Sequence, residues 1–360
     1  MQIIQDRRAL HRIPELGLQL PKTVGYVTGQ LENLGCQVFF PVDSCVCAFF
    51  DRGCSQTLAF RGDMDALPMT EHTGLEFASA HPGMMHACGH DGHTAILLEF
   101  ARHIRELETK YNILLIFQPG EENPGGAEKI CKTGLLQKYR VAAIFGLHLW
   151  PGLEKGALYS RRGAMMSRSC EVDVTVHGVS AHIGKAHQGK DALAAGLRFY
   201  REAVAMEQAM DPEVFRLLKF GRMESGSVRN AISDYTRLEG SLRTFDDGVF
   251  AWMRQKLLEV AAETEAATGC PVEVSMNEGY PAVHNPEELY EKVRKLVTLQ
   301  ELEAPSLTSE DFSWYQKEVP GMFFFLGLGD VPALHTPEFD FDESVLEEGV
   351  RLFAQLAAKY

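Results

Sequence analysis

The chain has 360 residues, of which 45% are hydrophobic and 23% are charged. This composition is typical of a folded globular protein and excludes global disorder, while the length predicts two domains or one large one. Lysine and arginine total 35 against 49 for aspartate and glutamate, which gives a net charge of −14. Because binding to a phosphate backbone needs clustered positive charge, we expect no nucleic-acid partner.

The N-terminal residues favour a location inside the cell. Asp6, Arg7 and Arg8 precede any apolar stretch, so no signal peptide is predicted. The longest apolar runs have the length of strands, far short of the roughly 20 residues of a membrane span. We therefore expect a cytoplasmic protein with no membrane partner. Its 8 cysteines are too sparse for a disulfide scaffold, so free thiols are predicted.

The first third of the sequence alternates between helical and strand patterns. Apolar residues recur at helical spacing in residues 23–34 and 94–107. Short apolar runs that are typical of buried strands lie at residues 46–50, 57–60, 112–118 and 141–149. Strands that alternate with helices predict an α/β sheet.

After Met166 the pattern changes to that of a second, smaller domain. Strands are predicted at residues 171–177, 214–224, 234–244 and 272–276, and long helices at residues 191–210 and 249–268. Their order, β-α-β-β-α-β, is that of the ferredoxin-like unit.

The α/β pattern resumes in the last part of the chain. A helix is predicted at residues 286–296, a buried strand at 321–326 and a terminal helix at 342–359. We therefore predict an α/β catalytic domain with a mixed sheet flanked by helices. Its two parts are residues 1–166 and 278–360, and a ferredoxin-like domain at residues 167–277 interrupts them.

The densest group of metal-binding residue types lies at residues 85–93, with the sequence Met-His-Ala-Cys-Gly-His-Asp-Gly-His. Cys88 and His90 are two positions apart, so both side chains can reach one point from a turning backbone. Thiolate and imidazole are ligands for divalent transition metals. The alternative interpretation is a buried cysteine beside surface histidines. For His86 and His93 the sequence predicts no partner, and the other seven cysteines are predicted to be small packing residues.

Carboxylates follow two of the predicted strands. Asp63 and Asp65 come after the strand at residues 57–60, and Glu121 and Glu122 come after the strand at residues 112–118. The carboxyl ends of strands are where α/β sheets build their sites. Adjacent carboxylates can divide the work, one binding metal and the other moving protons. Taken singly, each pair could also be an exposed acidic loop.

Two histidines complete the candidate set. His148 ends the strand at residues 141–149, and His335 lies in a loop before the last helix; each alone could be a packed imidazole. Five candidate ligands are too many for one tetrahedral site and suit two metal ions about 3.5–4 Å apart with a shared bridge. The five are Cys88, His90, Glu122, His148 and His335.

Short motifs along the chain resemble those of a known group of hydrolases, in the same order. They are residues 12–17 (Arg-Ile-Pro-Glu-Leu-Gly), 62–68 (Gly-Asp-Met-Asp-Ala-Leu-Pro), 86–93, 118–122 (Gln-Pro-Gly-Glu-Glu), 146–148 (Gly-Leu-His) and 334–339 (Leu-His-Thr-Pro-Glu-Phe). Together they resemble the amidohydrolase branch of the dinuclear metallopeptidases. That branch includes hippurate hydrolases, auxin-conjugate hydrolases and N-acetyldiaminopimelate deacetylases, and the likeness covers almost the whole chain.

The resemblance implies a metal-dependent amidohydrolase that acts on linear amides and releases a carboxylic acid and a free amino acid from an N-acyl amino acid. It implies two divalent metal ions, Mn²⁺ or Zn²⁺, held by the five candidate ligands with Cys88 as the bridge. Glu121 corresponds to the general base, and Asp65 to a carboxylate that orients a ligand histidine. Asp63 stands where the exopeptidase branches carry a histidine ligand, which favours the cysteine-bridged branch.

The resemblance extends to the inserted domain, which it implies is a lid and a dimerisation domain. His182, in residues 178–182, corresponds to a residue that stabilises the tetrahedral oxyanion. Asn230, in residues 225–232, could donate a hydrogen bond to the scissile carbonyl. Arg243, in residues 240–244, could hold a substrate carboxylate through its planar fork. A homodimer or higher homo-oligomer is expected through this domain.

Three other functions stay open from the sequence. A dipeptidase or carboxypeptidase could use the same two-domain frame, and a catalytically silent relative could bind without turnover. A cysteine hydrolase could use Cys88 as its nucleophile, in which case a chelator would not stop the activity.

Overall fold

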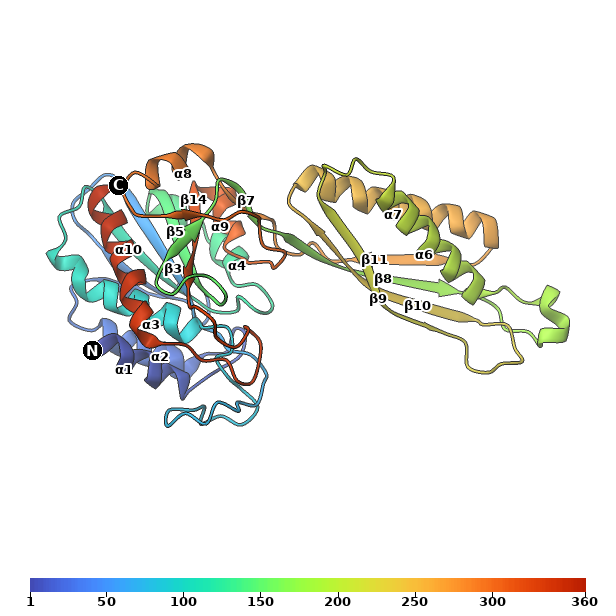
Figure 1. The fold of residues 1–360 in the computed structure, drawn as a ribbon, viewed down its shortest axis with the longest axis horizontal. Coiled ribbons are helices and arrows are strands. Elements are labelled where there is room, and N and C mark those ends of the chain that lie inside the picture. Colours follow the sequence, from blue (N-terminus) through green and yellow to red (C-terminus); the bar gives the residue numbers. More distant parts are fainter. The chain divides into compact units, whose positions relative to one another are not determined.

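The computed structural model describes all of residues 1–360. The chain divides into two compact units (Figure 1). The larger unit comprises Met1–Met165, Val283–Pro305 and Glu310–Tyr360, and the smaller unit comprises Met166–Ala282 with Ser306–Ser309. No helix is both long enough and apolar enough to cross a lipid bilayer.

The larger unit is built on a mixed, 8-stranded sheet with the strand order β1-β2-β4-β3-β5-β14-β6-β13. The strands are β1 (Gln37–Phe39), β2 (Val46–Phe50), β3 (Thr57–Asp63), β4 (Asn112–Gln118), β5 (Val141–Trp150), β6 (Leu158–Ser160), β13 (Gln300–Glu301) and β14 (Gly321–Gly327). The four central strands β4, β3, β5 and β14 run parallel to one another. Their carboxyl ends therefore meet at one edge of the sheet, where α/β proteins place their sites.

Helices flank this sheet and bury its apolar residues. They are α1 (Gln2–His11), α2 (Pro21–Leu31), α3 (His90–His103), α4 (Ala127–Cys131), α5 (Leu135–Lys138), α8 (Glu287–Val293), α9 (Ser313–Glu318) and α10 (Leu346–Lys359). Phe60 of β3 packs against Phe100 of α3 and Phe353 of α10. On the opposite face, Phe323 of β14 packs against Phe312, next to α9. Both faces of the central strands are thus covered, which explains why these strands are continuous apolar runs.

Several boundaries differ from those predicted. Helix α3 begins at His90, four residues earlier than the apolar spacing indicates, because the polar residues of its first turn are themselves buried. Helix α1 was not predicted, because its buried face mixes Ile3 and Leu10 with the buried Arg7 and His11. The strands of two to four residues were also missed, since such short segments carry no alternation.

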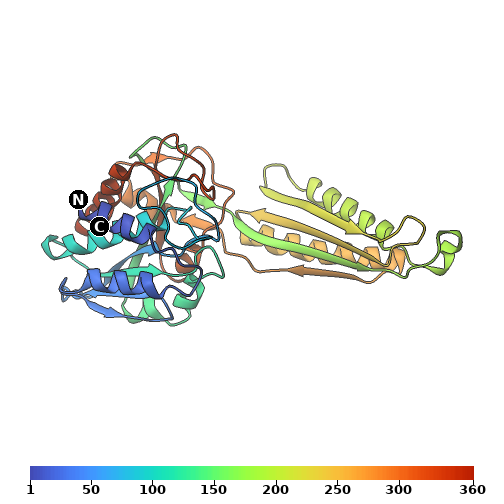
Figure 2. The ribbon, with the colours of Figure 1, turned by 90° about the horizontal axis from the view of Figure 1, so that it is seen from below.

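The smaller unit has a four-stranded antiparallel sheet with the strand order β11-β8-β10-β9. Its elements in chain order are β8 (Arg168–His177), α6 (Ala192–Gln208), β9 (Arg216–Ser225), β10 (Tyr235–Thr244), α7 (Asp247–Thr268) and β11 (Val272–Met276). This is the predicted β-α-β-β-α-β order. Both helices lie on one face of the sheet (Figure 2) and form its apolar core with the inward residues of the strands.

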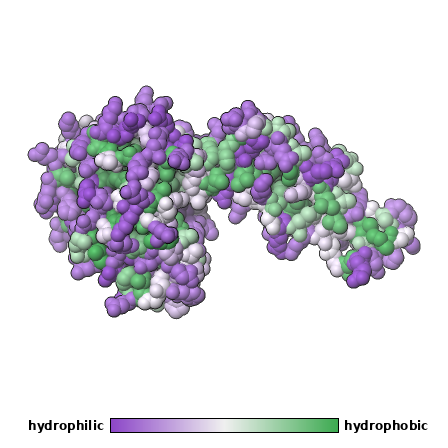
Figure 3. Space-filling model, in the orientation of Figure 1, coloured by the Kyte–Doolittle hydropathy of each residue, from purple (hydrophilic) through white to green (hydrophobic).

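Local signals define the two helices of the smaller unit. The Asp191 side chain accepts hydrogen bonds from the first-turn N–H groups of α6, and Asp246 accepts one from Val249 at the start of α7. Helix α7 ends at Gly269, whose φ of 70° is left-handed. A separate two-stranded sheet is formed by β7 (Gly163–Met166) and β12 (Val283–Asn285). Hydrophilic side chains dominate the visible surface of the larger unit (Figure 3), as expected when the apolar strands are internal.

Candidate metal centre

The candidate ligands come together at the carboxyl-terminal edge of the central sheet. Glu122 follows β4, His148 lies near the end of β5, and Cys88 and His90 lie where α3 begins. Gly89 separates Cys88 from His90 with a φ of 88°. Only glycine adopts this backbone conformation without strain, and it allows both neighbouring side chains to approach one point.

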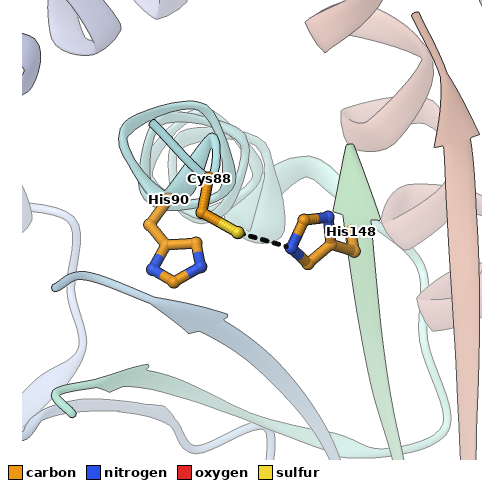
Figure 4. A group of neighbouring side chains, drawn as sticks. All are labelled: Cys88, His90 and His148. Carbon is orange, nitrogen blue, oxygen red and sulfur yellow. Dashed lines mark hydrogen bonds between the residues drawn. The ribbon is translucent and has the colours of Figure 1, made fainter. Parts of the chain in front are cut away.

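Cys88 lies between two histidines that are distant in the sequence. Its Sγ is 3.3 Å from Nε2 of His148 and 3.3 Å from Nε2 of His335. Figure 4 shows Cys88 and His90 at the start of α3 with the His148 ring facing the thiol from β5. A thiolate at this position can contact two metal ions at once.

Two groups of three possible ligands share this cysteine. One group is Cys88, His90 and His148, and the other is Cys88, Glu122 and His335; in each group the donor atoms all lie within 4.8 Å of one another. Two three-ligand groups with one common thiolate are the arrangement expected for a dinuclear site with a bridging ligand. The five residues of the predicted ligand set are therefore brought together.

The hydrogen bonds of His90 and His148 prepare both rings to bind metal. Nδ1 of His90 lies 2.8 Å from the backbone oxygen of Asp65, and Nδ1 of His148 lies 2.7 Å from the backbone oxygen of Leu149. A carbonyl oxygen can only accept, so each Nδ1 carries a proton, and the neutral form of each ring holds its lone pair on Nε2. Nε2 of His90 is buried and has no hydrogen-bond partner, which is the condition of a ligand atom awaiting a cation.

The backbone of His335 supports a functional role for this residue. Its φ is 61°, a left-handed conformation that is uncommon for a non-glycine residue. Strained residues of this kind gather at ligand-binding sites. The conformation brings Nε2 of His335 to 3.1 Å from Oε1 of Glu122. Its side chain is 51% exposed, so this ligand group is the one that opens to solvent.

The carboxylates, thiol and imidazoles of the metal-free site form a donor set suited to cations. Burial opposes protonation of His90, but the carboxylates of Asp63 and Asp65 outweigh it and raise the pKa of His90 to about 10. Burial, together with Glu122 and Glu121, raises the pKa of the Cys88 thiol. Burial lowers the pKa of His148, which keeps this ring neutral. A neutral imidazole and carboxylates beside a thiol are the donor set that borderline divalent metals prefer, so the residues fit two such ions.

Glu121 lies beside the two ligand groups without belonging to either. It is buried, and its Oε2 is 3.9 Å from Nε2 of His90. Burial and the nearby carboxylates of Glu310 and Glu122 raise the pKa of Glu121 well above its usual range. A raised pKa makes a carboxylate a stronger proton acceptor than an unperturbed glutamate.

Asp65 holds the loop that carries this glutamate. Its carboxylate accepts hydrogen bonds from the backbone N–H groups of Glu121, at 2.9 Å, and Glu122, at 3.1 Å. Its backbone oxygen accepts from His90, while its carboxylate Oδ1 lies 3.6 Å from the same ring nitrogen. Asp65 therefore positions the ligand histidine through the main chain and the acidic loop through its side chain.

A second network behind the ligands was not predicted from the sequence. Arg61 of β3 is fully buried and contacts the carboxylates of Asp63, Glu310 and Asp311 at 2.5, 2.9 and 2.8 Å. Asp63 also lies 2.6 Å from Nδ1 of His93. The signal available in the sequence was a charged residue inside an apolar strand, because buried charges need partners.

Three further groups of side chains are close enough to hold a metal ion. One of them, His90 with Glu121 and Glu122, belongs to the centre already described. The other two are Asp63 with His90 and His93, and Glu121 with Glu310 and Asp311, and Arg61 argues against both. The Arg61 guanidinium lies between these carboxylates and repels a cation there.

The three predicted residues of the inserted domain belong to the smaller unit. The ring nitrogen Nδ1 of His182 accepts a hydrogen bond from Gly184, and the backbone oxygen of Asn230 accepts one from Ile183. Adjacent segments therefore carry His182 and Asn230. Arg243 is part of β10, opposite Ser169 of β8 and Leu217 of β9.

Comparison with known proteins decides the family. Residues 59–359 match the sequence profile of peptidase family M20/M25/M40. The chain belongs to this family. The N-acetyldiaminopimelate deacetylase of Exiguobacterium sibiricum is 31% identical over 99% of this chain and 99% of its own length. An uncharacterized hydrolase of Staphylococcus epidermidis is 33% identical over 98% of this chain and 97% of its own length.

A solved structure of a relative agrees with the family assignment. It is a dinuclear metal-binding peptidase of the M20 family from Bacillus subtilis, 30% identical, which matches with a TM-score of 0.86 over 99% of this chain and 96% of that chain. The predicted superfamily is thus confirmed. The protein thus belongs to the M20 family and has two ligand groups that share Cys88. It is a metal-dependent hydrolase that acts on amide bonds and uses two divalent metal ions.

Proposed function

We propose that this M20 protein hydrolyses the amide bond of N-acyl amino acids and releases a carboxylic acid and a free amino acid. The observation that carries the proposal is the position of Glu121, a buried carboxyl group with a raised pKa, beside two ligand groups that share Cys88. The printed names of the relatives add support, since several of them are N-acetyldiaminopimelate deacetylases. N-acetyl amino acids are accordingly the first substrates to test.

The five candidate ligands would hold the two metal ions in two coordination groups. Cys88 would bridge two ions, with His90 and His148 completing one coordination group and Glu122 and His335 the other. When bound, such ions lower the pKa of a water molecule and polarise a carbonyl group. Mn²⁺ and Zn²⁺ suit this mixture of thiolate, imidazole and carboxylate ligands.

Glu121 moves the proton in the proposed reaction. It takes a proton from the attacking water and later delivers it to the leaving amine. Its burial and its carboxylate neighbours raise its pKa, which strengthens it as the acceptor of this proton. Asp65 keeps Glu121 in place through the loop N–H groups of Glu121 and Glu122.

The smaller unit supplies the substrate contacts in this proposal. His182 would stabilise the tetrahedral oxyanion, Asn230 would donate to the scissile carbonyl, and Arg243 would hold the substrate carboxylate. These roles rest on the motif resemblance of residues 178–182, 225–232 and 240–244. A lid function and a homodimer through this unit rest on the same resemblance.

The test combines metal analysis with substrate profiling. The purified protein is loaded with Mn²⁺ or Zn²⁺ and assayed against N-acetyl and N-benzoyl amino acids, with dipeptides as the comparison set. Faster cleavage of N-acyl amino acids, abolished by a chelator and restored by metal, supports the proposal. Preference for dipeptides would indicate a dipeptidase, and activity that survives chelation would indicate a cysteine hydrolase. A protein that binds metal but cleaves neither set would indicate a silent relative.

A further inference from the structure

We infer that His93, with Asp63, is a positioning residue that fixes the orientation of the metal ligand His148. This inference rests on the proposed metal centre and adds two residues that the ligand set does not contain. The connection runs from the Asp63 side chain through the His93 ring to the backbone of Leu149, and from there to His148. All four residues are buried.

The hydrogen bonds of His93 determine its tautomer. The backbone N–H of Leu149 lies 2.9 Å from Nε2 of His93. An N–H group can only donate, so Nε2 of His93 carries no proton and acts as the acceptor. Nδ1 of His93 therefore carries the proton and donates it to Oδ1 of Asp63 at 2.6 Å. Both ring nitrogens are thus used, and His93 cannot bind a metal ion without breaking a buried hydrogen bond.

Leu149 passes the constraint on to His148. The same residue whose N–H donates to His93 accepts, through its carbonyl oxygen, the Nδ1 proton of His148 at 2.7 Å. This bond keeps the Nε2 lone pair of His148 directed at Cys88, 3.3 Å away. The Leu149 N–H belongs to the peptide group that joins His148 to Leu149, so its hydrogen bond to His93 also holds the backbone from which the His148 ring projects.

The strand pairing explains why this backbone group needs a partner. Pairing of β3 with β5 ends at Arg61 and Gly146, whereas β5 continues to Trp150. The Leu149 N–H lies beyond the last pair on that side, and in this buried position a missing partner is costly. His93 of α3 supplies the hydrogen bond that β3 no longer provides.

The packing of α3 against β5 is built for this contact. A Cβ atom added at Gly92 would lie 2.6 Å from Cδ1 of Leu149, so the first turn of α3 lies directly against this side chain of β5. Asp63 is held on its other oxygen by Arg61, with 2.5 Å between Nη1 and Oδ2. The Asp63 end of the connection is therefore fixed by a buried ion pair. The Leu149 end is fixed by the close packing of α3 on β5.

The test separates the two hydrogen bonds of His93. In His93→Gln the side-chain amide can reach the Nε2 position and accept from Leu149, whereas in His93→Asn it can reach only the Nδ1 position and donate to Asp63. His93→Leu removes both bonds. Ile96→Val, a buried change on the same helix, controls for lost stability because it leaves the histidines intact.

The measurement is the affinity of the metal-free protein for Zn²⁺, determined by competition with a chelator. We expect His93→Leu and His93→Asn to bind about 10–100-fold more weakly than wild type, and His93→Gln and Ile96→Val to stay close to wild type. Wild-type affinity in His93→Leu would overturn the inference, as would weak binding by His93→Gln alone. Failure of the wild type to bind metal would instead overturn the proposed function.

Discussion

The Sγ atom of Cys88 lies 3.3 Å from Nε2 of His148, although the two residues are 60 positions apart in the chain. The thiol comes from the start of α3, and the imidazole from the end of β5. The same sulfur is equally close to His335, so one atom connects both ligand groups. The metal centre therefore depends on Cys88 more than on any single histidine.

Cys88→Ser tests that dependence. A serine hydroxyl does not ionise as readily as a thiol, so the bridge between the two ligand groups is lost. We expect metal affinity and amide hydrolysis to fall by at least about 100-fold, measured by metal analysis and by turnover of an N-acetyl amino acid. Cys131→Ser is the matched control, because this buried thiol has no part in the site. Equal metal affinity in the two variants would contradict a bridging role.

Glu121 and Glu122 are adjacent, but we expect their glutamine variants to have opposite phenotypes. Glu121→Gln should keep both metal ions and lose turnover by roughly 10²–10⁴-fold, because an amide cannot carry the proton. Glu122→Gln should lose metal, because it removes a carboxylate from the group with Cys88 and His335. Metal content and kcat measured on the same preparations distinguish the two. Substantial turnover in Glu121→Gln would remove that residue from the role of base.

Asp65→Asn should weaken the centre without removing a ligand. The carboxylate accepts from the N–H groups of both Glu121 and Glu122, and an asparagine offers one oxygen and an unwanted donor in its place. A loss of about 10–100-fold in metal affinity or activity is expected. Asp51→Asn is the control, since the Asp51 side chain only accepts from Gly53 in an exposed turn. The role assigned to Asp65 fails if both variants match wild type in a chelator competition assay.

We expect the ionisation of His11 to make the stability of the fold depend on pH, independently of catalysis. Burial opposes its charge, but hydrogen bonds to Asp91 and Glu71 raise the pKa of His11 to about 9 from 6.5. A folded pKa above the unfolded value stabilises the fold below pH 6.5, and this contribution disappears as the pH rises through about 9. The shift corresponds to a free energy on the order of 3 kcal/mol.

The check is urea unfolding of the metal-free protein between pH 6 and pH 10. His11→Gln should be less stable than wild type at pH 6, and the difference should shrink toward pH 10. His103→Gln, on the exposed end of α3, should follow the wild-type curve. A constant difference between His11→Gln and wild type across this range would show that His11 stays neutral in the folded protein.

Much of the candidate centre could be predicted because its residues occupy local patterns. Cys88 and His90 stand out within one short motif, and Glu122 and His148 follow apolar runs that are recognisable as strands. Parallel strands bring their carboxyl ends to one edge, so the gathering of these side chains followed from the expected sheet.

The supporting residues could not be predicted in the same way. The partners of His93 are the side chain of Asp63 and a backbone group of Leu149, and neither contact leaves a pattern in the sequence. They exist because α3 packs closely on β5 and because β3 ends before β5 does. Such contacts depend on tertiary packing, and therefore only the structure reveals them.

Anomalous diffraction from crystals of the zinc-loaded protein tests most directly whether two metal ions share the Cys88 thiolate. We expect two zinc peaks about 3.5–4 Å apart, each roughly 2.3 Å from Sγ of Cys88. His90 and His148 should contact one ion, and Glu122 and His335 the other. A single zinc ion, or two ions that do not both contact Cys88, would contradict a shared thiolate.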